Sequence, residues 1–91
     1  MRADDAELNH RERATLRAVA TGRAELTCSR EPDLFIDGLA VCDQPCARRL
    51  ANLGLIATAR SGRPGERVPA TVTRAGEAAL RRTRIAPPTA A

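Results

Sequence analysis

The stretch 43–76 most constrains the fold, because it combines one short helix pattern with a pair of strand patterns. Asp43 can accept hydrogen bonds from the free N–H groups of a first helical turn, and Pro45 is tolerated in that turn. Gly54 then ends the helix. The sequence therefore predicts a short helix over 44–53.

Two runs with strand composition follow this helix, at 55–60 and 67–73. The segment 61–66 between them is Ser-Gly-Arg-Pro-Gly-Glu, which has turn composition. Pro69 predicts that the second strand lies at a sheet edge, since proline donates no hydrogen bond to a neighbouring strand. The sequence therefore predicts a helix followed directly by a hairpin that carries arginines.

The predicted helix has an apolar side and a polar side. Helical spacing gives an inward group of Cys46, Leu50 and Leu53, and an outward group of Gln44, Arg48 and Asn52. Arginine pairs with guanine O6 and N7, whereas glutamine and asparagine pair with adenine N6 and N7. The outward side chains are therefore candidates for reading DNA bases, although a solvated polar helix face has the same composition.

Charge is divided unevenly along the chain. Residues 1–43 carry six arginines and nine acids, whereas residues 44–91 carry nine arginines and two acids. The basic half coincides with the predicted helix and hairpin, as binding to a phosphate backbone requires. The fifteen basic side chains are all arginine, a composition typical of a bacterium with a GC-rich genome.

The C-terminal half resembles the winged-helix transcription regulators, especially those of the MarR type. The resemblance rests on Leu50, on Gly54-Leu55-Ile56, on the Gly/Arg turn and on Val72-Thr73-Arg74-Ala75-Gly76. It implies a recognition helix that enters the major groove and a wing that contacts the flanking backbone or minor groove. By position, the DNA-binding residues would be Gln44, Arg48, Arg49, Asn52, Arg60, Arg63 and Arg67.

The remaining segments complete an α+β winged-helix domain over 8–85, between a flexible start (1–7) and a disordered tail (86–91). Asn9 and Glu12 form a capping-box pattern, which predicts a helix from His10 to about Thr21 with Leu16, Val19 and Ala20 buried. The run 24–29 alternates like a strand with Leu26 and Cys28 inward. Thr73 can cap a closing helix from Arg74 to about Arg84, in which Gly76 allows close packing.

The segment 34–42 allows two structures. Asp37-Gly38 between apolar runs predicts a tight β-hairpin. Alternatively, Pro32 starts a helix that directs Leu34, Phe35, Leu39 and Cys42 to the core, as the first helix of a helix-turn-helix would. The helix register would place Pro45 inside the recognition helix, at a cost of about 3 kcal/mol, so we favour the hairpin.

Three cysteines, Cys28, Cys42 and Cys46, leave one unpaired in any disulfide framework. Burial of all three as small core residues needs the fewest assumptions. The other interpretations are a redox pair, Cys42 and Cys46, at the start of the recognition helix, and a zinc site, for which a second compact ligand pair is missing.

No catalytic motif, cofactor motif or metal-binding motif is evident, so we do not expect an enzyme. We also expect no membrane-spanning segment and no secretion signal, hence a cytoplasmic protein. The expected partners are double-stranded DNA and a second copy of the chain, since one short recognition helix rarely binds tightly alone. The alternative is a winged-helix adaptor whose basic half binds an acidic protein, with thiol redox sensing.

Overall fold

The computed structural model describes residues 8–85, with side chains described as far as residue 82. The expected flexible start and disordered tail lie outside these residues. The elements, in chain order, are α1 (His10–Ala20), β1 (Ala24–Thr27), β2 (Leu34–Ile36), β3 (Leu39–Ala40), α2 (Gln44–Asn52), β4 (Ile56–Thr58), β5 (Arg67–Val72) and α3 (Arg74–Ile85). The chain therefore has the predicted α+β class.

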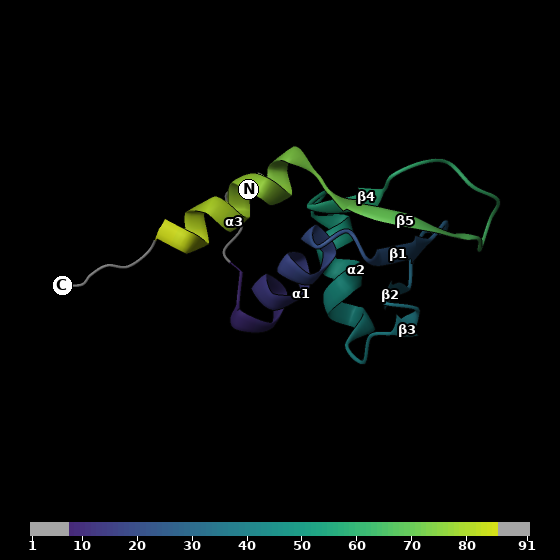
Figure 1. Ribbon diagram of the computed structural model, residues 1–91, viewed down its shortest axis with the longest axis horizontal. Helices are drawn as coiled ribbons and strands as arrows, with labels where there is room; N and C mark the ends of the chain where they lie inside the picture. Colours follow the sequence, from purple (N-terminus) through teal and green to yellow (C-terminus); the bar gives the residue numbers. More distant parts are fainter. Residues whose placement is uncertain (1–7, 86–91) are drawn as a thin grey trace.

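The strands form an antiparallel sheet in the order β3-β2-β1-β5-β4. Helix α1 packs against α2, α3 and strands β1 and β5, while α2 contacts β4. Figure 1 shows the loop between β4 and β5 projecting from the end of the molecule farthest from α3. This projecting hairpin, residues 56–72, is called the wing below.

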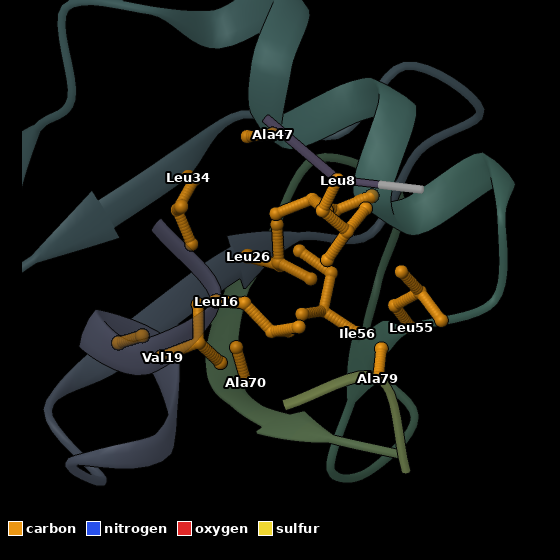
Figure 2. Packing of buried hydrophobic residues seen from close by; sticks show 12 residues of the cluster. Leu8, Leu16, Val19, Leu26, Leu34, Ala47, Leu55, Ile56, Ala70 and Ala79 are labelled. Carbon is orange, nitrogen blue, oxygen red and sulfur yellow. The ribbon is translucent and has the colours of Figure 1, made fainter. Parts of the chain in front are cut away.

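The core lies between the helices and the inward side of the sheet. Leu16 from α1, Leu26 from β1 and Ile56 from β4 are each at most 2% exposed, and their side chains meet in Figure 2. Branched aliphatic residues and alanines build this core, while Phe35 is only half-buried. Ala20, which was predicted to be buried, is exposed at the end of α1.

Helix α1 begins as its sequence predicts. The Glu12 backbone N–H donates to Asn9 Oδ1 at 2.8 Å, and the Asn9 N–H donates to Glu12 Oε1 at 3.0 Å. Leu8 is buried against the same core. The capping box is confirmed, and it fixes the side chain of Glu12 at a buried position.

The segment 34–42 is the hairpin of β2 and β3. Asp37 and Gly38 both have positive φ, at 53° and 82°, as the two central residues of a tight primed turn require. The hairpin prediction is confirmed, and the alternative helix is wrong. Leu39 is consequently exposed on an edge strand, and Phe35 lies away from the core cluster.

The prediction that the second wing strand is a sheet edge was wrong, because β5 lies between β1 and β4. Pro69 is paired with Glu25 of β1, but the position of its missing N–H faces the other side, where the pairing with β4 ends at Ala70. The Pro69 carbonyl accepts from the N–H of Ala59, just beyond β4, at 2.7 Å. At this point the strand pairing has ended, so no carbonyl of β4 requires a hydrogen bond from residue 69.

Helix α3 begins directly after the wing. The Gly76 N–H donates to Thr73 Oγ1 at 3.1 Å, which confirms the predicted cap. A Cβ at Gly76 would lie 2.2 Å from the Leu55 carbonyl oxygen, so this glycine is required for the close approach of α3 to the turn before β4. The closing helix therefore fixes the base of the wing.

Candidate nucleic-acid interface

Helix α2 is set at a fixed orientation by its cap and its buried side. Asp43 Oδ1 accepts from the Cys46 N–H at 3.1 Å, as predicted. Cys46, Ala47 and Leu50 are buried, whereas Asn52 is exposed. The prediction that Cys46 and Leu50 face the core is confirmed, whereas the complete burial of Ala47 was not predicted.

Gln44 does not project outward as predicted. Its Oε1 accepts from the Leu34 N–H at 2.8 Å, and its Nε2 donates to the carbonyl oxygens of Leu34 and Val41, each at 3.1 Å. Because buried Ala47 turns this edge of α2 toward the β2–β3 hairpin, the amide of Gln44 completes the hydrogen bonding of that hairpin. Gln44 is thus a structural link between α2 and the hairpin, and the prediction that it projects outward was wrong.

Arg48 connects α2 to the loop between β1 and β2. Its Nη2 donates to Asp33 Oδ1 at 2.6 Å, and its side chain is 35% exposed. Among the described residues, its Nε atom is buried without a hydrogen-bond partner. Arg48 therefore reaches the surface only in part, with its charge already matched by Asp33.

Arg49 compensates a buried charge. Its guanidinium pairs with the carboxylate of Glu12, a side chain that is only 8% exposed. An unpaired carboxylate at such a position would be costly, because burial removes the water that stabilises its charge. The pair therefore binds α2 to α1, a role that the sequence pattern did not reveal.

The three arginines of the wing lie in different environments. Arg60 is exposed and lies 3.6 Å from Glu66, a weak pairing at the surface. Arg63 is exposed near the turn, and its guanidinium has no partner in the described part of the chain. Arg67 pairs with Glu25 at 3.5 Å, and its guanidinium carbon lies 4.3 Å from the Phe35 ring centroid.

Arg67 and Phe35 belong to the outer side of the sheet, because the alternate residues Val68 and Leu34 face the core. A cation over an aromatic ring, with a carboxylate beside it, is held in place by both contacts. Arg67 is therefore the wing arginine with the strongest contacts inside the molecule, whereas Arg60 and Arg63 are available to a partner.

Asn52 and the wing border the same cavity. This cavity, of about 510 Å³, lies between the end of α2, the β1–β2 loop and the base of the wing. Its polar lining includes Arg30, which is not among the predicted DNA-binding residues. Arg30 stands in a turn-like segment far from the predicted helix, so only the fold could bring it near Asn52. The lining residues are Leu26, Thr27, Cys28, Ser29, Arg30, Pro32, Ala51, Asn52, Ile56, Ala57, Thr58, Ser61 and Gly62.

The three cysteines differ in exposure, so the prediction that all three are core residues was wrong. Only Cys46 is buried, Cys28 is half-buried and Cys42 is exposed. Burial raises the pKa of the Cys46 thiol above its ordinary value of 9.0, although a hydrogen bond to Thr15 acts in the opposite direction. Cys42 follows the edge strand β3, so it contributes nothing to the packing of the core.

A second cavity, of about 590 Å³, lies between the starts of α1 and α2. Its charged lining is paired internally, Arg11 with Asp43 and Arg49 with Glu12. The described residues contain no group of three or more His, Cys, Asp or Glu side chains placed to hold a metal ion.

Comparison with models of protein families, with curated proteins and with solved structures found no match. Among the described residues, no helix combines the length and apolar character that crossing a membrane requires.

Proposed function

We propose that this protein binds double-stranded DNA as a small winged-helix transcription regulator. In this proposal the exposed side of α2 enters the major groove, and the wing lies along the flanking backbone or minor groove. Asn52 contacts a base edge, Arg48 lies at the margin of the groove, and Arg60 and Arg63 contact phosphates. Gln44 has no part in this interface.

The observation that supports the proposal best is the shared cavity. Asn52 at the end of α2 and Ser61 in the loop between β4 and β5 line one surface depression, although eight residues lie between them in sequence. A recognition helix and a wing must border a common surface to contact one duplex at the same time. The basic character of residues 44–91 supports the same partner.

The ion pairs of the arginines reduce the number of arginines available for contact with DNA. Arg49 and Arg67 each have a fixed role inside the molecule, with Glu12 and with Glu25 and Phe35 respectively. Arg63 has no such role, and the pair of Arg60 with Glu66 is long and exposed, so exchange of Glu66 for a phosphate costs little. The proposed interface is therefore centred on Asn52 and the wing turn.

The small number of base-reading side chains favours a homodimer on a two-fold site, since two copies would double the contacts. It also favours the second candidate, an adaptor that binds an acidic protein through the wing and makes no base contact. The observation that favours the adaptor is the hydrogen bonding of Gln44 to Leu34 and Val41, because it leaves one fewer side chain on α2 to contact bases.

Selection of bound sequences from a random duplex pool distinguishes the two functions. We expect an enriched motif with two-fold symmetry, whose binding weakens as the salt concentration rises. A pool without enrichment, together with no salt-dependent binding of any duplex at low ionic strength, would contradict the regulator and leave the adaptor.

A further inference from the structure

The cavity beside Asn52 has a lining suited to an anion. Within the described part of the chain, Arg30 is the one charged residue that lines it, and no carboxylate residue does so. Four hydroxyl-bearing residues also line the cavity, namely Thr27, Ser29, Thr58 and Ser61. Hydroxyl donors together with one arginine form the usual set of phosphate contacts in protein–DNA complexes.

The deeper part of the cavity is apolar. Leu26, Pro32 and Ile56 are buried there, and Ala51 and Ala57 are half-buried beside them. These small and aliphatic side chains leave room for a compact group that is partly apolar, such as a deoxyribose ring next to its phosphate. The lining therefore matches one sugar–phosphate unit better than an isolated ion.

The loop that carries Arg30 is fixed to the wing by backbone hydrogen bonds. The Cys28 N–H donates to the Glu66 carbonyl at 2.9 Å, and the Gly65 N–H donates to the Cys28 carbonyl at 2.8 Å. At the other end of the loop, the Asp33 N–H donates to Thr27 Oγ1 at 2.8 Å. Arg30 is thus carried by a loop that is closed on itself and joined to the wing.

Gly62 brings the wing close to this loop. A Cβ at Gly62 would lie 2.8 Å from Glu66 Oε1, 2.9 Å from Val68 Cγ1 and 3.0 Å from Cys28 Sγ, so a larger residue would displace these side chains. The hydroxyl of the adjacent Ser61 therefore lines the same cavity as Arg30.

We propose that this cavity binds a phosphate group, with Arg30 as its cation and the neighbouring hydroxyls as further donors. This inference rests on the proposed function in one respect, namely that the phosphate belongs to the backbone of the bound duplex. Arg30 then contacts the phosphate next to the base that Asn52 contacts, and it couples the wing to the recognition helix.

Inorganic phosphate tests the cavity without DNA. Titration of the full chain with phosphate at constant ionic strength, followed by amide NMR shifts, should give saturable shifts for Ser29, Arg30, Asn52 and Ser61. Chloride at the same ionic strength should not give them. Absence of saturable shifts at these residues would overturn the proposal, whether or not the protein binds DNA.

A matched pair of variants tests the source of the phosphate. Arg30→Gln should lower the slope of log K against log salt for duplex binding by about one, because one phosphate contact is lost. Arg17→Gln removes the same charge from the exposed side of α1, outside this cavity, and should leave the slope unchanged. Equal slopes for the two variants would overturn the assignment to a DNA phosphate. Absence of duplex binding by the unmodified chain would instead contradict the proposed function.

Discussion

The side chain of Gln44 forms two hydrogen bonds with the backbone of Leu34, accepting from its N–H at 2.8 Å and donating to its carbonyl at 3.1 Å. The amide thus continues the hydrogen bonding of β2 at Leu34, where the residue pairing with β3 has ended. Through this contact the first residue of α2 fixes the hairpin, and the hairpin in turn fixes the orientation of the helix. The polar residue nearest the helix start is consequently part of the fold.

Replacement of Gln44 by alanine should therefore reduce stability. The N–H of Leu34, a residue with 0% exposure, would lose its partner, whereas the Leu34 carbonyl would keep the Val41 N–H at 3.0 Å. A buried unpaired N–H costs about 1–3 kcal/mol. Urea unfolding measures the loss, and the sequence preference of duplex binding should not change. A variant as stable as the parent, with an altered preferred motif, would show that Gln44 reads bases after all.

Asn52→Ala should have the opposite effect. Asn52 is exposed and has no side-chain partner in the described part of the chain, so stability should change by less than about 0.5 kcal/mol. Discrimination at one base position should fall by about 1–3 kcal/mol, because the bidentate contact with the base is lost. Competition binding with single-base variants of the selected duplex measures this, and uniform weakening across all bases would contradict base readout by Asn52.

The wing arginines should separate into two groups. Arg63→Gln should lower the salt slope of duplex binding by about one, since its guanidinium is free to contact a phosphate. Arg67→Gln should change the slope much less, because Arg67 lies on the outer side of the sheet with Glu25 and Phe35. Anisotropy measurements across a salt series provide both slopes, and a larger change for Arg67→Gln would place the duplex on the outer face of the sheet.

The thiols should react in an order set by exposure. Cys42 should react first with a thiol reagent, Cys28 more slowly, and Cys46 only when the protein unfolds. Only the thiolate is nucleophilic, and burial disfavours that form of Cys46. Mass spectrometry of single-cysteine variants distinguishes the three sites, and rapid labelling of Cys46 in the folded protein would contradict its burial.

The raised pKa of Cys46 also links stability to pH. In the unfolded chain this thiol ionises near its ordinary value of 9.0, whereas in the folded chain it ionises at a higher pH. The folded state therefore loses relative stability as the pH rises above about 9, and the loss is complete above the folded pKa. Cys46→Ser should reduce this alkaline loss, as urea unfolding at several pH values would show.

Local sequence signals predicted much of the fold. The capping box of Asn9 and Glu12, the Asp37-Gly38 turn and the Thr73 cap each depend on residues close in sequence, and the structure contains all three. Glycine at position 76 was likewise expected to permit close packing, as it does against Leu55. Such features need no knowledge of the tertiary arrangement.

The candidate site depended on distant contacts, and there the prediction failed in part. Helical spacing could not show that Ala47 would be completely buried, so Gln44 was predicted on the solvent side of the helix. The partner of Arg49 is Glu12, which lies on another helix and 37 residues away in sequence. Pro69 suggested an edge, because the early end of the pairing between β4 and β5 cannot be read from composition.

Mapping of the DNA contact surface tests the central claim most directly. The full, isotopically labelled chain would be titrated with the selected duplex, and the amide shifts assigned residue by residue. We predict the largest shifts at Asn52 and across the wing turn 60–65, with little change at Gln44 and on the outer side of the sheet near Phe35. Shifts confined to that outer side or to α3, or no shifts at all, would contradict the account.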